Sequence, residues 1–202
     1  MAPTTALQLA DWRRAVAELY AAVRAEPDPA AAHASWRRGR DGLFANHPQS
    51  PLGRADPLRR SGLPCWPYDP AMRFEVPVTP AAAAQRIEVD TGADGVTRYE
   101  LIGTVRLPAP LSEELALWWT AQYGGGLFLP VRDGTAGDTS YGGGRYLLDT
   151  TKGADLGGTG DLLVVDLNFL YHPSCRYDDR WVCPLAPAQN TIAARIRAGE
   201  RI

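Results

Sequence analysis

The stretch IEVDTGADGVTRYELIGTVRL, residues 87–107, has the pattern of a β-hairpin. Apolar and polar residues alternate on both sides of the dipeptide Asp94-Gly95, which is a strong signal for a tight turn. Alternation with a period of two puts every second side chain on the same face of a strand. The sequence therefore predicts two neighbouring antiparallel strands here. The alternating positions are Ile87, Val89, Tyr99, Leu101, Gly103, Val105 and Leu107.

The same period of two occurs on both sides of this hairpin. Phe74, Val76 and Val78 alternate with Glu75 and Pro77. Because proline has no N–H to give to a second neighbour, we expect this segment to be an edge strand. Within residues 162–168 the alternation puts Asp166 and Asn168 on one face. Further strands are expected at 115–119, 127–131, 146–148, 162–168 and 192–196, with a helix as the alternative for the last.

The N-terminal segment has the different spacing of an amphipathic helix. We expect this helix over residues 5–26, with a capping box formed by Thr5 and Gln8 and an end at Pro27. Its apolar residues recur at intervals of three and four, which makes one stripe along the helix. The stripe consists of Leu9, Trp12, Val16, Leu19, Tyr20 and Val23.

A second helix is expected directly afterwards. Asp28 suits the N-cap position and Pro29 suits the first helical position, so the helix is predicted to run to about Arg38 and to stop at Gly39. Residues 46–70 are rich in X-Pro pairs, which disfavour helix. We expect this segment to wrap irregularly around the core.

These elements predict an α+β fold that is mainly β. Two N-terminal helices would pack on a curled, mostly antiparallel sheet of about seven or eight strands, or on a partly open barrel. The length fits one domain over residues 1–202. We expect a helical segment at 1–45, a proline-rich wrapping segment at 46–70 and a β-rich core at 71–202.

The composition is that of an ordinary soluble globular protein. A net charge of −2 argues against a nucleic-acid partner. No apolar run reaches the roughly 20 residues that cross a bilayer, so no membrane partner is expected. Residues 1–12 lack the pattern of a signal peptide, and we expect a cytoplasmic protein with reduced thiols. A local basic cluster is interpreted as a solvated face; it comprises Arg37, Arg38, Arg40, Arg54, Arg59 and Arg60.

The glycine-rich region between residues 134 and 160 does not carry a nucleotide signature. Neither the G-x-x-x-x-G-K-[ST] loop nor a G-x-G-x-x-G in a strand-turn-helix context occurs. We expect these glycines to serve tight turns and close approach of strands. The sequence predicts no particular cofactor.

Cys175 and Cys183 lie eight residues apart, with Asp178 and Asp179 as turn formers between them. Three interpretations are open. The thiols could be a buried structural pair, or they could join His172 and Cys65 in a metal site, although no C-x-x-C spacing favours zinc. Alternatively, Cys175 could be a nucleophile with His172 as its base.

Polar residues gather in the last third of the chain among apolar strands, which is typical of a ligand site. Arginine is suited to carboxylate or phosphate because its guanidinium fork matches their geometry. An arginine–carboxylate pair that only holds the structure is the alternative. The predicted pocket consists of Arg132, Asp133, Tyr141, Arg145, Asp166, Asn168 and Tyr171.

In these segments the chain resembles the bacterial domain-of-unknown-function 1684 family. Three positions depart from the family pattern: Leu167 stands where phenylalanine is usual, His172 where asparagine is usual, and Gln189 where glutamate is usual. The resemblance implies one shared site without a particular activity, and no family-wide catalytic role for His172. It rests on Ser50–Leu52, Leu127–Asp133, Thr135, Gly137, Tyr141–Leu147, Asp166–Asn168, Tyr171–Tyr177, Cys183–Leu185 and Ala198–Glu200.

Three functions are therefore considered. The leading hypothesis is binding of a small polar or anionic organic molecule in a β-rich pocket. The second is a hydrolase-like enzyme that uses Cys175 or Asp166 with Asn168 and Arg145. The third is a structural or partner-binding protein in which the motifs hold strand crossings together. The sequence predicts no oligomeric state.

Overall fold

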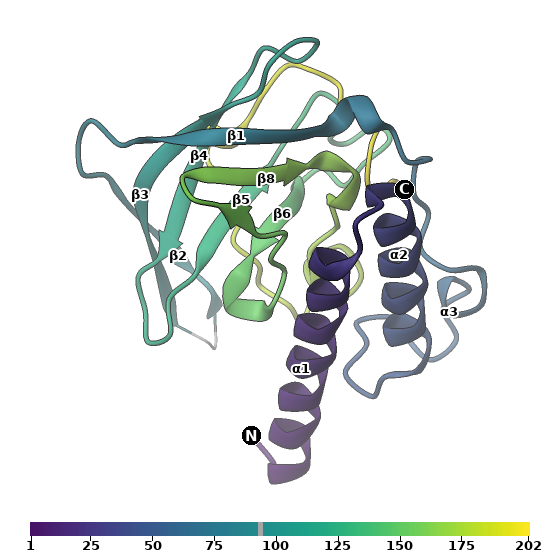
Figure 1. Cartoon of the computed structure of the whole chain (residues 1–202). Coiled ribbons are helices and arrows are strands. Elements are labelled where there is room, and N and C mark those ends of the chain that lie inside the picture. Colours follow the sequence, from purple (N-terminus) through teal and green to yellow (C-terminus); the bar gives the residue numbers. More distant parts are fainter. Residues whose placement is uncertain (93–94) are drawn as a thin grey trace.

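The computed structural model describes residues 1–92 and 95–202. Helices α1 (Pro3–Ala25) and α2 (Pro29–Asn46) stand side by side against one end of a curled sheet (Figure 1). The predicted fold class is confirmed. Asp94 of the predicted hairpin turn lies outside the described residues, whereas Gly95 has a φ of 81°, as a tight turn requires.

Within the described residues, the sheet has eight strands, and every neighbouring pair is antiparallel. Their order is β6-β5-β4-β3-β1-β8-β7, and β2 pairs with β3 beside this path. The strands are β1 (Arg73–Pro80), β2 (Arg86–Asp90), β3 (Val96–Arg106), β4 (Glu114–Thr120), β5 (Leu127–Val131), β6 (Arg145–Asp149), β7 (Gly158–Thr159) and β8 (Leu162–Asp166).

Short helical turns punctuate the connections. They are α3 (Leu58–Ser61), η1 (Pro70–Met72), η3 (Thr150–Lys152), η4 (Leu167–Phe169), η5 (Ser174–Arg176) and η6 (Ala188–Asn190). The segment 46–70 is otherwise irregular, as its X-Pro pairs predict.

Both helices differ from the prediction at one end. Helix α1 begins at Pro3 with Ala2 as N-cap and no side-chain cap, so the capping box at Thr5 is wrong. Asp28 does cap α2, since its carboxylate accepts from Ala30 N at 2.9 Å. However, α2 continues through Gly39. A methyl group there would lie 2.6 Å from Leu19 Cδ1, so this glycine lets the two helices approach closely.

The prediction that β1 is an edge strand is wrong, because β1 lies between β3 and β8. Arg73 to Pro77 pair with β8, whereas Val78 to Pro80 pair with β3. Pro77 therefore stands where β1 has only one partner. A central strand tolerates the missing N–H at this switch of neighbours.

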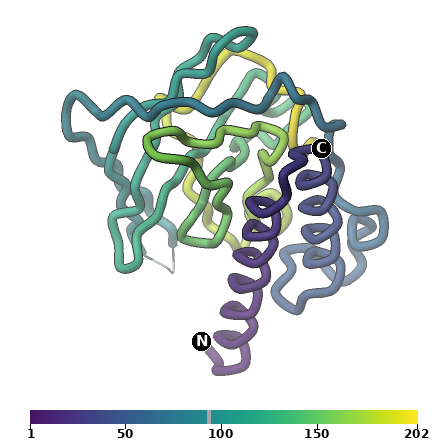
Figure 2. The backbone as a smooth tube through the Cα atoms, viewed as in Figure 1, coloured from purple at the N-terminus to yellow at the C-terminus, as the bar shows by residue number. Residues whose placement is uncertain are grey.

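Two further strand predictions need correction. Strand β8 ends at Asp166, and Asn168 lies in the turn η4 instead of on the same strand face. Residues 192–196 are irregular, and isolated bridges flank them, from Thr191 to Arg132 and from Glu200 to Cys65. Figure 2 shows this C-terminal segment, in yellow, running from the sheet toward the helices. Its alternating residues Ile192 and Ile196 are buried without a strand ladder.

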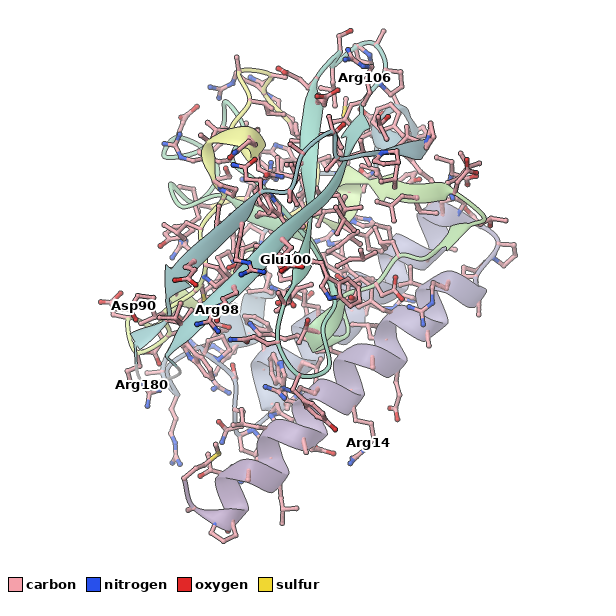
Figure 3. All side chains as sticks on the ribbon, turned by 90° about the vertical axis from the view of Figure 1, so that its left-hand side faces the viewer. Arg14, Asp90, Arg98, Glu100, Arg106 and Arg180 are labelled. Carbon is pink, nitrogen blue, oxygen red and sulfur yellow. The ribbon has the colours of Figure 1, made fainter. Side chains whose placement is uncertain are left out.

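The core lies between the helices and the inner face of the sheet. Trp36 of α2 packs edge-on against Phe169, with ring centroids 5.2 Å apart, and both are almost fully buried. The outer face of β2 and β3 carries exposed ion pairs, among them Arg98 with Glu88 at 2.9 Å (Figure 3). In the described part of the chain, no helix is both long and apolar enough to cross a membrane.

Candidate functional site

Arg145 and Asp133 form an ion pair inside the core. Arg145 Nη2 lies 3.0 Å from Asp133 Oδ1, and the two side chains are 0% and 1% exposed. The guanidinium also donates to the carbonyl oxygens of Ile196 and Glu200, each at 3.0 Å, and to that of Ala198. These bonds hold the irregular C-terminal segment against β6. The pair therefore satisfies buried backbone groups and does not open onto a pocket.

Asp166 and Asn168 form a second buried cluster. Asn168 Nδ2 donates to Asp166 Oδ1 at 2.8 Å and to Asp69 O at 2.9 Å, and its Oδ1 accepts from Asp69 N at 2.9 Å. The amide thus ties the wrapping segment to the end of β8. Burial raises the pKa of Asp166, although the Asn168 hydrogen bonds and Arg73 oppose this.

Arg40 and Glu200 form a third buried pair, which the sequence interpretation missed. Arg40 Nε donates to Glu200 Oε1, while Glu200 Oε2 accepts from His172 N at 2.7 Å. Burial acts to raise the pKa of Glu200, but Arg40 beside it holds that pKa below its usual value. The interpretation of the basic cluster as a solvated face is wrong for Arg40. It is also wrong for Arg59, which donates to three backbone carbonyls.

His172 is placed as a neutral acceptor. Its Nε2 accepts from Tyr141 N at 3.2 Å. Burial lowers the pKa of His172 to about 4, although Glu200 opposes this. A base for Cys175 would need that same nitrogen lone pair to be free. The histidine therefore fixes the loop before β6, and the geometry gives it no role as a base.

The two C-terminal thiols lie together, as the sequence allowed. Cys175 N donates to Cys183 Sγ at 3.4 Å, and Tyr141 Oη donates to Cys175 Sγ at 3.8 Å. The hydrogen bond from Cys183 lowers the pKa of Cys175 to about 6, with burial opposing and Tyr141 assisting. Cys183 correspondingly has a raised pKa. In the described residues, no group of three or more His, Cys, Asp or Glu is placed to hold a metal ion.

A pocket of about 190 Å³ lies between α1 and the segment 171–183. Aromatic rings from both helices, from β6 and from the segment 171–183 line it. Charged groups also line it: Arg13 from α1, Arg40 from α2, Asp149 at the end of β6 and Lys152 in η3. The apolar and aromatic lining consists of Leu9, Trp12, Val16, Tyr20, Phe44, Tyr146, Ala154, Tyr171, Pro173, Trp181 and Val182.

A second pocket, of about 300 Å³, lies where the end of α1 and the start of α2 meet β1 and β8. Arg24 and Arg73 line it, together with Glu26, Glu75 and Asp166. Its cations already face carboxylates, since Arg73 lies 2.8 Å from Glu75 and 3.9 Å from Asp166. It therefore resembles a solvated polar groove more than an apolar ligand site.

Residues 60–201 match the family model described as "Protein of unknown function (DUF1684)". The chain belongs to the DUF1684 family. It is also similar to the solution NMR structure of an uncharacterized protein from Haloarcula marismortui, with 34% identity and a TM-score of 0.57. That match covers 82% of this chain and 90% of the other chain. Comparison with curated proteins finds no match.

In this DUF1684 chain, the predicted site residues fall into separate places. Asp133 and Arg145 pair in the core, and Asp166 joins Asn168 at the end of β8. Tyr141 contacts Cys175, as described above. The remaining two are Tyr171, which lines the 190 Å³ pocket, and Arg132, whose Nε donates to Gly142 O on the surface.

Sequence reasoning missed the helix residues of the 190 Å³ pocket. Trp12 and Tyr20 belonged to the predicted apolar stripe of α1, and the stripe gave no sign of which members leave a cavity. Arg13 directly follows Trp12. This cation beside an aromatic residue is the signal in the sequence that could have indicated a binding site on α1. Glu200 belongs to the Ala198–Glu200 segment of the family pattern, but the pattern does not indicate its pairing with Arg40.

Proposed function

We propose that this DUF1684 protein binds a small organic anion with an aromatic or otherwise apolar body in the 190 Å³ pocket. The proposal narrows the polar or anionic ligand expected from the sequence. The observation that carries it is an aromatic pocket with more positive than negative charge at its mouth.

The charge count supports an anion. Arg40 is balanced by Glu200, and Lys152 Nζ lies 3.4 Å from Asp149 Oδ2. Arg13 forms no ion pair among the residues that the structure describes, and it is close enough to Lys152 to oppose the raising of that lysine's pKa by Asp149. Two cations thus face one carboxylate, and a ligand carboxylate would relieve their repulsion.

The volume and the lining support a small aromatic body. Pockets for drug-sized ligands measure about 300–1,000 Å³, so this pocket suits a smaller molecule. The rings of Trp12, Tyr20 and Trp181 border it, and aromatic rings favour offset or edge-on contacts with one another. Tyr20 lines the pocket, and its buried hydroxyl has no hydrogen-bond partner among the described residues.

The hydrolase alternative has weaker support. Arg145 is engaged with Asp133 and backbone carbonyls, away from the Asp166 cluster. Both the oxygen and the nitrogen of the Asn168 amide are already hydrogen-bonded, to Asp69 and Asp166. A reacting carboxylate would need a neighbouring group that is free to act on a substrate.

The test is a calorimetric titration with 2-naphthoate and with its neutral analogue 2-naphthamide. The two differ in charge and share an aromatic body. We expect 2-naphthoate to bind more tightly, by roughly tenfold, because one charge-assisted contact contributes about 1–2 kcal/mol. Equal binding of both probes, or binding of neither, contradicts the proposal.

Arg13 and Arg14 provide a matched pair of variants. Both are exposed and adjacent in α1, but Arg14 pairs with Asp11 and does not line the pocket. Its side chain points outward from α1 (Figure 3). Arg13→Ala is expected to remove the preference for the anion while leaving the fold intact. Arg14→Ala is expected to bind 2-naphthoate as the unchanged protein does. Equal losses in both variants would show a nonspecific charge effect.

A further inference from the structure

Cys175 and Cys183 lie next to each other. The backbone N–H of Cys175 donates to Cys183 Sγ at 3.4 Å, and the Cys183 side chain is the largest influence on the pKa of Cys175. The turn η5 and the turns within residues 177–180 bring the chain back so that Cys183 lies beside Cys175. This closeness favours a bond between the two sulfurs, because a disulfide needs cysteines whose side chains already approach each other.

Cys175 has the surroundings of a reactive thiolate. Three donors act on its sulfur: the thiol of Cys183, the phenol of Tyr141 and backbone N–H groups. They bring its pKa to about 6, so most of it is thiolate at neutral pH. Cys183 keeps its proton, since its pKa is raised by the thiolate beside it and by burial. The pair therefore contains one thiolate that can attack a substrate, Cys175, and one protonated thiol that can act in a second step, Cys183.

The loop that carries the pair is accessible. Both sulfurs belong to half-buried residues, and Val182 next to Cys183 is 53% exposed. Cys65 differs from them. It lies beneath α2 near Glu200, and burial raises its pKa to about 12. The chain thus contains its own unreactive control thiol.

We propose that Cys175 and Cys183 form a thiol–disulfide exchange site whose substrate is a small organic disulfide. The Cys175 thiolate attacks one sulfur of the substrate, forms a mixed disulfide and releases one thiolate. Cys183 then attacks Cys175 Sγ, which releases the second substrate thiol and closes the Cys175–Cys183 disulfide. The protein dithiol loses two electrons and two protons, and the substrate disulfide gains them as two thiols.

The first test follows glutathione disulfide added to the fully reduced full-length protein at neutral pH, with acid quenching and intact-mass analysis. The expected product is lighter by two hydrogen atoms, with two glutathione molecules released per chain. Peptide mapping is expected to place the new disulfide between Cys175 and Cys183, with Cys65 still a thiol. A stable glutathione adduct on the unchanged protein, or no reaction beyond that of Cys65, overturns the proposal.

Variants separate the two steps. Cys183→Ser is expected to stop at the mixed disulfide on Cys175, because the resolving thiol is gone. Cys175→Ser is expected to lose the fast reaction altogether. A Cys183→Ser protein that forms no adduct overturns the order of attack, provided that its circular dichroism spectrum matches that of the unchanged protein.

Tyr141 is proposed as a positioning residue, and its test needs more than a rate. In Tyr141→Phe, the midpoint of the pH profile for iodoacetamide alkylation of Cys175 is expected to move upward, because one donor to the thiolate is removed.

A further test compares the alkylation rates of two cysteines in the unchanged protein and needs no variant. Its Cys175 is expected to react at least tenfold faster than Cys65 near neutral pH; equal rates overturn the proposal.

Discussion

Arg145 shows how strongly one buried residue can hold distant segments together. Its guanidinium reaches Asp133, which follows β5, and also the carbonyls of Ile196 and Glu200 near the C-terminus. A charge without exposure is stable only when its partners compensate for lost hydration. Arg145, which suggests a ligand clamp in the sequence, therefore has structural partners at both Nη1 and Nη2, whereas its buried Nε has no hydrogen-bond partner among the described residues.

Replacing Arg145 by alanine is expected to destabilise the protein strongly. The change would leave Asp133 buried without its cation, which typically costs about 3–5 kcal/mol. Urea unfolding measures this loss. Arg98→Ala is the matched control, since its ion pair with Glu88 is 53% and 56% exposed and worth about 0–1 kcal/mol. Similar losses in both variants would contradict the structural role of Arg145.

His172 makes the stability depend on pH. Its folded-state pKa of about 4 lies below its ordinary value of 6.5, so the unfolded chain takes up the proton first as the pH falls. The stability that the neutral ring contributes is present above about pH 6.5 and is lost progressively toward about pH 4. His33 has a similarly lowered pKa of about 4, because it is buried and close to Arg37.

The corresponding test compares unfolding free energies at about pH 7 and about pH 5, where most carboxylates stay ionised. The unchanged protein is expected to lose on the order of 2–4 kcal/mol between them, from both histidines together. His172→Asn is expected to lose visibly less over the same interval. An unchanged slope in the variant would mean that the ring titrates normally in the folded state.

At the level of elements, the C-terminal segment depends on Gly199. Its φ is 76°, and a methyl group there would lie 2.4 Å from Leu170 O. Gly137 has a φ of 81° with nothing within 4 Å of such a methyl group. Both glycines permit a left-handed backbone conformation. Of the two, only Gly199 also lets the C-terminal segment approach the backbone at Leu170 closely.

The pair Gly199→Ala and Gly137→Ala isolates this contact. Each alanine should cost about 1–2 kcal/mol for the backbone conformation alone. Gly199→Ala is expected to cost about 1–3 kcal/mol more, because Leu170 must move. Thermal unfolding measures both. Equal melting temperatures would show that the C-terminal segment is not tightly docked against Leu170.

The strands and helices that follow local rules could be predicted, and the failures have physical reasons. The hairpin of β2 and β3 follows from alternation around a turn signal. Pro77 could not be placed, because the change of partner along β1 depends on residues far away in the sequence. Gly39 resembles a helix stop in the sequence, but its role depends on Leu19 of α1, which packs against it and leaves no room for a side chain. Residues 192–196 alternate, but the side chains of Asp133 and Arg145 bind the backbone N–H and C=O of Ile196, which a strand ladder would use.

At the scale of the whole molecule, the helices and the sheet leave an aromatic pocket where they meet. Its walls come from α1, α2, the turn after β6 and the segment 171–183, which are far apart in the sequence. Residue types alone indicated candidate groups in the last third of the chain. They could not show which of these groups would form buried ion pairs with one another. They also could not show that α1 would place the cation Arg13 at the pocket.

The central claim is that this aromatic pocket is the binding site. The most direct test is to map amide chemical shifts during addition of 2-naphthoate to the isotope-labelled protein. We predict that the shifts gather at Trp12, Lys152 and Val182, around the aromatic pocket. Shifts that gather instead at Arg73 and Gly158, around the polar groove near β8, or no shifts at saturating 2-naphthoate, would contradict it.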